Sequence, residues 1–329
     1  MPKKVKTSKN IIKDDQFIDS FLRPKTFNDY IGQGKIKKGL EIILKAAQKR
    51  RESIDHLLFY GQPGLGKTTL ATLVAGETGA NLRIVSAPSL NRTGDLAALL
   101  TNLEERDVLF IDEAHRLNPA VEEVFYSAMD SGRLNITIGK GPSSRIIPID
   151  LPPFTLIAAT TRINLISSPL RSRFGAIFRL DYYNNEEINT IIERSADILK
   201  IKIALDAVST IAKASRFTPR LANRLLKRSR DIAEVNDIRV IKREIVLEAF
   251  DMLGIDEMGL EIHDRRLLEI MIEKFGNRPV GINSLAASLG EDKDTIEEIY
   301  EPYLLKIGFI QRTPSGRIAT SEAKKWLGY

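Results

Sequence analysis

The 329-residue sequence contains no cysteine, only three histidines and a single tryptophan. Without cysteine the chain has no disulfides, no thiolate metal ligands and no cysteine nucleophile. His56, His115 and His263 lie too far apart in the sequence to favour a histidine-based metal site. No run approaches the roughly 20 apolar residues of a membrane-spanning helix, and the N-terminus lacks the apolar core of a signal peptide. We therefore expect a cytoplasmic protein that does not enter a membrane.

The overall composition is typical of a globular protein, with 43% hydrophobic and 28% charged residues. Lysine and arginine number 49 against 43 acidic residues, and the net charge of +6 favours a nucleic acid or another anionic partner. Residues 1–13 hold five lysines and no acid, so we interpret residues 1–20 as a disordered basic tail. The remaining length is sufficient for two or three domains.

Short apolar runs alternate with helical patterns in residues 21–183. The apolar runs lie at 56–61, 81–87, 107–113 and 154–160, and helical patterns lie at 68–79 and 120–130. Apolar strands separated by helices indicate an α/β domain with a parallel sheet covered on both sides. At about residues 130–150 a Gly-Lys-Gly-Pro turn between apolar runs predicts an inserted β-hairpin. The hairpin is a docking surface if its apolar side chains are exposed; otherwise it packs on its own domain.

The pattern changes after this domain. In residues 184–255 the strand signal disappears, and helical periodicity predicts a small helical domain. Residues 256–329 show three short helical patterns, at 264–275, 282–289 and 294–307. Two extended runs follow, on either side of the turn Pro314-Ser315-Gly316. Three helices followed by a hairpin are typical of a winged helix.

The strongest motif is the segment from Gly61 to Thr68, which matches G-x-x-x-x-G-K-[ST]. It follows a predicted strand and precedes a predicted helix, which is the context that a P-loop requires. The glycines allow backbone N–H groups to surround phosphates at a helix N-terminus. Lys67 then supplies charge to the β- and γ-phosphates, and Thr68 supplies a hydroxyl ligand to Mg²⁺. The sequence therefore predicts an ATP and Mg²⁺ site.

A second motif follows the predicted strand at 107–113, which ends in Asp112 and Glu113. Downstream of a P-loop, this order places Asp112 beside the metal and leaves Glu113 to polarise a water molecule. Together with Ala114 and His115 the pair spells the box of DEAH helicases. Those enzymes need a second RecA-like domain, which this chain lacks, so we interpret the box as a coincidence.

Polar and basic residues at later positions are weaker candidates. Thr160 and Thr161 end the strand at 154–160, where they contact the γ-phosphate or merely cap the strand. Arg173 is placed to act on a neighbouring subunit's nucleotide or to form a surface salt bridge. Arg220 opens a predicted helix. Arg312 and Arg317 flank the final turn, where they point toward DNA phosphates or belong to a solvated basic face.

The order of these features resembles that of AAA+ ATPases. Longer stretches are similar to the RuvB family of bacterial Holliday-junction branch-migration motors. They include LRPKTFNDYIGQ (22–33), LFIDEAHRLNPAVEE (109–123), SPLRSRFG (168–175) and EPYLLKIGFIQRTPSGRIAT (301–320). The resemblance extends from about Phe21 to Thr320 and implies an AAA+ domain at 21–183, a helical lid domain at 184–255 and a winged-helix domain at 256–329.

The resemblance implies an ATP-dependent DNA translocase that drives branch migration of Holliday junctions in homologous recombination and DNA repair. Such a motor acts as a homo-hexameric ring around duplex DNA. It works with RuvA, docked on the hairpin at about 130–150, and with RuvC in a larger resolving complex.

The resemblance also implies roles for individual residues. Leu22, Arg23 and Tyr183 line the adenine side of the pocket, and Gly64, Gly66, Lys67, Thr68 and Thr69 hold phosphates and Mg²⁺. Asp112 and Glu113 are the Walker B pair, Thr161 is sensor 1 with Thr160 as the alternative, and Arg220 is sensor 2. Arg173 is the finger acting on the neighbouring subunit, and Arg312 and Arg317 contact DNA.

The sequence departs from the family pattern at four places, one of which is Ala114 where the family has a larger aliphatic residue. Gln62 replaces a proline and Ser315 replaces a basic residue at the wing turn, which weakens the expected DNA contact there. The segment Asp130-Ser131-Gly132 differs from the usual acidic-aromatic pattern.

Two other functions compete with a translocase. One is a clamp-loader-like switch that remodels a partner without translocating, which the winged helix disfavours. The other is a winged-helix DNA-binding regulator that uses its ATPase domain only for assembly, which the intact Glu113 disfavours.

The P-loop interpretation predicts that Lys67→Ala abolishes nucleotide binding, because the substitution removes the charge directed at the β- and γ-phosphates. Calorimetric titration of the purified variant with ATP measures this directly. An unchanged affinity would contradict the P-loop interpretation.

Overall fold

The computed structural model describes residues 21–138 and 145–329. The chain divides into two compact units. The first contains the described residues up to Thr190 together with the short segment Thr218–Arg220, and the second contains Ile191–Phe217 and Leu221–Tyr329. The predicted α/β region therefore forms one unit, and the predicted helical and winged regions share the other.

The first unit is built around a parallel sheet. Its strands are β1 (Leu57–Tyr60), β2 (Leu82–Ser86), β3 (Val108–Asp112), β6 (Thr155–Thr160) and β7 (Ala176–Arg179). The described residues place them in the order β2-β3-β6-β1-β7, with every neighbouring pair parallel. The predicted strands are confirmed, whereas β7 was not predicted. This edge strand is four residues long and only partly buried, so it lacks the continuous apolar run of the central strands.

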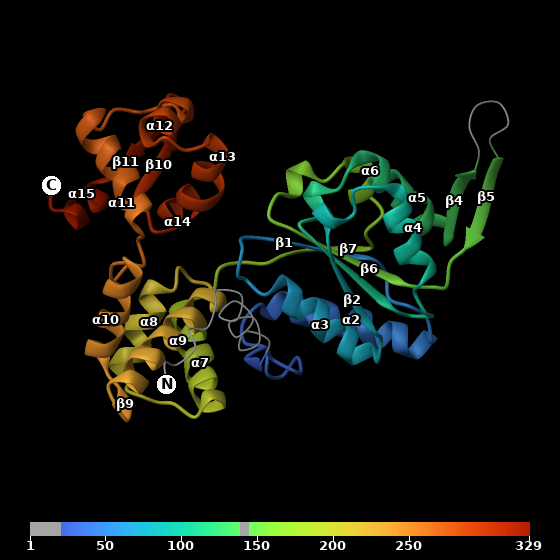
Figure 1. The fold of residues 1–329 in the computed structure, drawn as a ribbon, viewed down its shortest axis with the longest axis horizontal. Helices are drawn as coiled ribbons and strands as arrows, with labels where there is room; N and C mark the ends of the chain where they lie inside the picture. The colour runs from blue at the N-terminus through green and yellow to red at the C-terminus, as the bar shows by residue number, and fades with distance from the viewer. Residues whose placement is uncertain (1–20, 139–144) are drawn as a thin grey trace, which may run out of the picture. The chain divides into compact units, whose positions relative to one another are not determined.

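Helices cover both faces of this sheet (Figure 1). One face carries α2 (Gly34–Arg50) and α3 (Lys67–Thr78); the other carries α4 (Thr93–Thr101), α5 (Pro119–Ser131) and α6 (Ser168–Arg171). The second face holds a large apolar cluster in which Leu109 of β3 and Leu156 of β6 pack with Phe125 of α5. Because β1, β3 and β6 are buried on both faces, their sequences are almost wholly apolar.

The predicted hairpin is present as β4 (Arg133–Ile138) and β5 (Arg145–Asp150), an antiparallel pair in register from Arg133 opposite Asp150. It forms its own two-stranded sheet, and Figure 1 shows it projecting from the end of α5. Leu134 is buried at its base, whereas Ile147 is 45% exposed. The hairpin therefore presents apolar surface beyond the domain core.

The second unit begins with four helices, α7 (Asn185–Leu199), α8 (Leu205–Ala214), α9 (Pro219–Val235) and α10 (Arg243–Leu253). The first residues of α7 and α9 belong to the first unit. The expectation that this region lacks strands is wrong in one detail. A parallel pair joins β8 (Lys202–Ile203) to β9 (Val240–Ile241). Two-residue strands are too short to produce a periodic sequence signal.

The remainder of the second unit is a winged helix. It comprises α11 (Ile262–Glu269), α12 (Ile282–Leu289), α13 (Lys293–Thr295), α14 (Glu301–Lys306), the hairpin strands β10 (Ile310–Thr313) and β11 (Gly316–Ala319), and α15 (Ser321–Leu327). Two π-helical turns, Ile270–Lys274 and Ile296–Tyr300, extend α11 and precede α14. Leu267, Met271 and Leu304 are fully buried in its apolar core. Within the described residues, no helix is long and apolar enough to span a membrane.

Gly316 allows the wing to pack against the rest of this domain. Its φ angle is +136°, and a Cβ added there would lie 2.3 Å from the carbonyl oxygen of Val280. The close approach lets Val280 and Arg317 exchange two backbone hydrogen bonds of 2.8 Å. The wing is therefore held to the domain by its backbone.

Gly316→Ala is expected to loosen the wing, because the contact with Val280 must open and the backbone strain costs about 1–3 kcal/mol. Amide hydrogen exchange of residues 310–319 in the full chain should become faster. Gly281→Ala is the matched control, since Gly281 has a φ of −68° and no atom within 4 Å of an added Cβ. Equal exchange in the two variants would contradict this account of the wing.

Candidate active site

The loop between β1 and α3 has the backbone conformation that phosphate binding requires. Gly64 and Gly66 have φ angles of +81° and +100°, which residues with side chains rarely adopt. A Cβ added to Gly66 would lie 2.8 Å from the hydroxyl oxygen of Tyr30. The glycines are therefore required by the packing of the loop as well as by its expected ligand.

The Lys67 ammonium group lies within this loop. Its Nζ donates hydrogen bonds to the carbonyl oxygens of Gly61 and Gln62, at 2.8 and 3.1 Å. Burial lowers the pKa of Lys67, while the carboxylates of Asp112 and Glu113 act in the opposite direction. The structure thus brings the predicted P-loop cation close to the predicted Walker B pair.

Two tyrosines pack against the other side of the loop. The Tyr183 hydroxyl lies 3.2 Å from that of Tyr30 and 3.3 Å from the carbonyl oxygen of Leu65. Burial raises the pKa of Tyr183 to about 12, so its hydroxyl stays protonated. Leu22 is also buried and Arg23 is partly exposed. Sequence reasoning assigned no role to Tyr30, because a single tyrosine in a loop carries no periodic or motif signal.

Asp112 is the last residue of β3, and Glu113 follows it directly. Glu113 has a φ of +54°, in the left-handed region, and its backbone N–H donates to Asp112 Oδ1 at 3.0 Å. The Asp112 carboxylate and the Thr68 hydroxyl are hard oxygen donors of the kind that Mg²⁺ prefers. In the described part of the chain, no group of three or more acidic, histidine or cysteine side chains forms a metal cage of its own. The donor set therefore suits a magnesium ion whose remaining ligands are phosphates and water.

The two threonines at the end of β6 differ in their surroundings. Thr160 is buried, and its Oγ1 accepts a hydrogen bond from the Arg162 N–H and lies 2.9 Å from His115 Nδ1. Thr161 is partly exposed. The Thr160 hydroxyl is thus used inside the protein, which favours Thr161 as the residue that meets a phosphate.

The structure brings one of the predicted arginines to the P-loop. Arg220 belongs to the first unit, and its Cβ lies 3.1 Å from the position of a Cβ added to Gly64. Arg173 instead contacts residues of α5 and α6 in the same chain. Its Nε and Nη2 donate to Asp130 Oδ2 at 2.9 and 2.7 Å, and its guanidinium lies 4.5 Å from the centre of the Tyr126 ring. Asp130 is therefore the residue that holds Arg173 in this chain.

The two wing arginines share one buried carboxylate, which the sequence did not predict. Glu301 is 1% exposed and accepts hydrogen bonds of 2.8–3.2 Å from Arg312 and Arg317. Burial opposes ionisation of Glu301, but these hydrogen bonds outweigh it and lower its pKa below the usual value. The Arg317 side chain is only 15% exposed and also pairs with Glu297, whereas that of Arg312 is 56% exposed. Arg317 therefore faces inward here, and the contact of both arginines with DNA stays a prediction.

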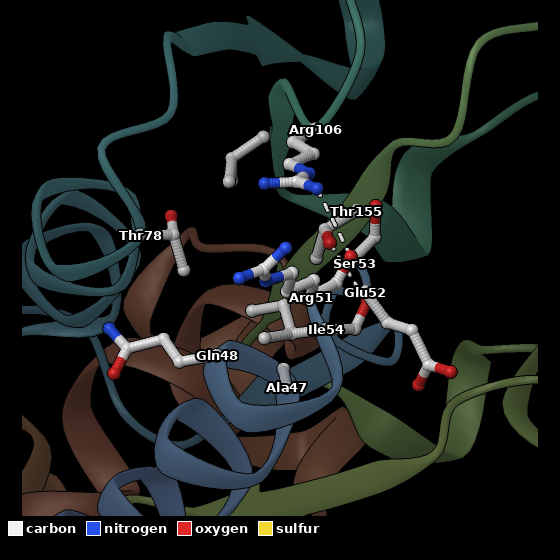
Figure 2. A pocket seen from close by; sticks show the side chains of 10 residues that line it. Ala47, Gln48, Arg51, Glu52, Ser53, Ile54, Thr78, Arg106 and Thr155 are labelled. Atoms are coloured by element: carbon white, nitrogen blue, oxygen red, sulfur yellow. Dashed lines mark hydrogen bonds between the residues drawn. The ribbon is translucent and has the colours of Figure 1, made fainter.

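A small cavity lies elsewhere in the first unit (Figure 2). It is lined by Val108 and Thr155, the first residues of β3 and β6, and by Arg51 and Arg106. Arg106 donates to the Arg51 carbonyl oxygen at 3.0 Å across it. Because the P-loop follows the opposite end of β1, this cavity is not the nucleotide site.

The parallel sheet with its P-loop, the Asp-Glu pair after β3, the lid helices and the winged helix define an AAA+ ATPase with a winged-helix domain. Three family models match the chain. They are the Holliday junction DNA helicase RuvB P-loop domain at residues 22–180, the RuvB AAA lid domain at 183–256 and the RuvB C-terminal winged helix domain at 257–328.

Solved structures agree with these matches. The chain is 50% identical to the Thermotoga maritima RuvB Holliday junction branch migration motor, with a TM-score of 0.85, over 94% of this chain and 99% of that one. A point mutant of the Thermotoga protein matches equally well, with 50% identity over the same shares and a TM-score of 0.86. The chain belongs to the RuvB family and is an ATPase of the helicase-type motors.

Glu301→Gln is expected to destabilise the winged helix by about 3 kcal/mol, because it leaves two arginines without their buried carboxylate. Since the folded pKa of Glu301 is lowered, its stabilisation is present above the unfolded value near 4.5 and is lost as the pH falls through the folded value. The difference between wild type and variant should therefore be constant near neutral pH and shrink in acid.

Urea unfolding followed by the fluorescence of Trp326, the one tryptophan of the sequence, measures this difference in the full chain. Glu297→Gln is the control, because Glu297 is 42% exposed and its ion pair is with Arg317. A loss as small as that of the control would show that Glu301 does not brace the wing.

Proposed function

We propose that this protein is an ATP-driven motor that moves duplex DNA and drives branch migration of Holliday junctions. The observation that carries the proposal is the combination of a complete P-loop site and a winged helix in a chain half identical to the Thermotoga branch migration motor. The three domains are taken as residues 21–183, 184–255 and 256–329 within this proposal.

In the proposed ATPase site, the backbone N–H groups around Gly64 and Gly66 bind the phosphates of ATP. Lys67 exchanges its two carbonyl partners for phosphate oxygens, and Thr69 adds a hydroxyl at the helix N-terminus. Thr68 and Asp112 would hold a magnesium ion, which would neutralise phosphate charge. Glu113 then accepts a hydrogen bond from the attacking water, and Thr161 orients the γ-phosphate.

Arg220 and Arg173 have different positions in this proposal. Arg220 stabilises phosphate charge within its own chain, which its position against Gly64 supports. Within the described residues, Arg173 contacts Asp130, Pro169 and Tyr126, which all lie outside the P-loop site. We therefore assign Arg173 to the nucleotide of the next subunit in a homo-hexameric ring.

The remaining surfaces take the partners. The hairpin of β4 and β5 docks RuvA, in keeping with its projection and its exposed Ile147, and the assembly joins RuvC in a resolving complex. At the wing, Arg312 is the arginine exposed enough to reach a DNA phosphate, while Arg317 pairs with the buried Glu301 that also holds Arg312.

Arg173→Ala is expected to bind ATP normally but to lose turnover by about 10³-fold or more, as removal of an arginine finger does in related enzymes. Mixing it with Glu113→Gln subunits tests action between subunits. An Arg173→Ala subunit retains Glu113 in its own site, and a neighbouring Glu113→Gln subunit supplies Arg173 to that site. Mixed rings should therefore regain activity. Arg171→Ala serves as the control for a nearby arginine. No recovery in the mixture would place the finger within its own chain.

The motor itself is tested on a synthetic four-way junction with ATP and the cognate RuvA. Wild type should dissociate the junction, and Glu113→Gln should not, because hydrolysis is lost while nucleotide binding is retained. Brisk ATP turnover on plain duplex without junction dissociation would instead support a clamp-loader-like switch.

A further inference from the structure

His115 occupies a position between the Walker B glutamate and the end of β6. Its Nε2 lies 3.4 Å from Glu113 Oε2, and its Nδ1 lies 2.9 Å from Thr160 Oγ1. The side chain is only 8% exposed, whereas that of Glu113 is 42% exposed. A buried and fixed group thus contacts a carboxylate that is otherwise open to solvent.

The hydrogen-bond donors and acceptors of this cluster assign the position of the imidazole proton. Burial lowers the pKa of His115, so the ring is neutral at pH 7. A carboxylate only accepts hydrogen bonds, so the imidazole proton is assigned to Nε2, the atom that faces Glu113. Nδ1 then accepts from the Thr160 hydroxyl, whose oxygen itself accepts from the Arg162 N–H.

The backbone makes such a support necessary. Glu113 has a left-handed φ of +54°, a conformation that costs non-glycine residues about 1–3 kcal/mol and recurs at functional sites. A glutamate on a strained turn has several side-chain rotamers open to solvent. A donor on one of its oxygens restricts them and leaves the other oxygen for water.

We propose that His115 is a positioning residue of the ATPase reaction, which holds the Glu113 carboxylate through Nε2–H and is itself oriented by the Thr160 hydroxyl. The inference rests on the proposed role of Glu113. The distance of 3.4 Å is longer than an ordinary hydrogen bond, as is common before the substrate binds, and shortens in the complex with nucleotide. Thr160 directly precedes Thr161, the proposed sensor of the γ-phosphate. His115 therefore links the segment of this sensor to the carboxylate of Glu113.

The two ring nitrogens can be tested separately. Glutamine places an amide N–H near the position of Nε2, whereas asparagine reaches only as far as Nδ1. His115→Gln should therefore retain kcat within about threefold, and His115→Asn and His115→Ala should lower it by about tenfold or more, since small misplacements of a catalytic group have large effects. KM and the affinity for ADP should be unchanged in all three variants.

Two further measurements separate positioning from folding and from the proposed function. Thr160→Val should lower kcat in wild type but have little additional effect in His115→Ala, because the two residues act as one unit. Glu113→Gln must abolish turnover; if it does not, the proposed function fails before His115 is tested.

Equal kcat values for His115→Asn and His115→Gln would overturn the positioning role. An increase in kcat on loss of the side chain would also overturn it, because it would mean that His115 holds Glu113 away from the water. A parallel loss of ADP affinity and melting temperature would reduce His115 to a packing residue.

Discussion

The position of β6 between β1 and β3 is the constraint on which the ATPase site depends. In a parallel sheet all carboxyl ends lie at the same edge, so the segments that follow three adjacent strands necessarily meet. The P-loop follows β1, the Asp-Glu pair lies at the end of β3, and the two threonines lie at the end of β6 between them. Helices on both faces keep the three strands buried and thereby fix this edge. The sheet alone therefore brings these three segments together.

The parts of this arrangement that the sequence predicted are those with local signals. The P-loop has fixed spacing, and β1, β3 and β6 read as continuous apolar runs because they are buried on both faces. Strand β7 was not predicted, because this edge strand of four residues is only partly buried and lacks a continuous apolar run. The pair of Arg173 with Asp130, and the sharing of Glu301 by two arginines, join residues far apart in the sequence. Tertiary packing alone brings such residues together.

His115 illustrates a different limit of sequence reasoning. The four letters from Asp112 to His115 were rightly separated from the DEAH helicases, because the rest of the chain forms a lid and a winged helix. The histidine of these four letters nevertheless contacts Glu113 and Thr160 with its two ring nitrogens. A motif can be the wrong family signature and still contain a residue that matters, because the contacts of a side chain depend on the fold around it.

The assignment of Thr218–Arg220 to the first unit, while Phe217 and Leu221 belong to the second, limits how the protein can be dissected. A fragment that ends at Thr190 retains the sheet and the P-loop but loses Arg220. A fragment long enough to include Arg220 must carry Ile191–Phe217 without the rest of its unit. The residues that surround the P-loop therefore come from two separate stretches of the chain.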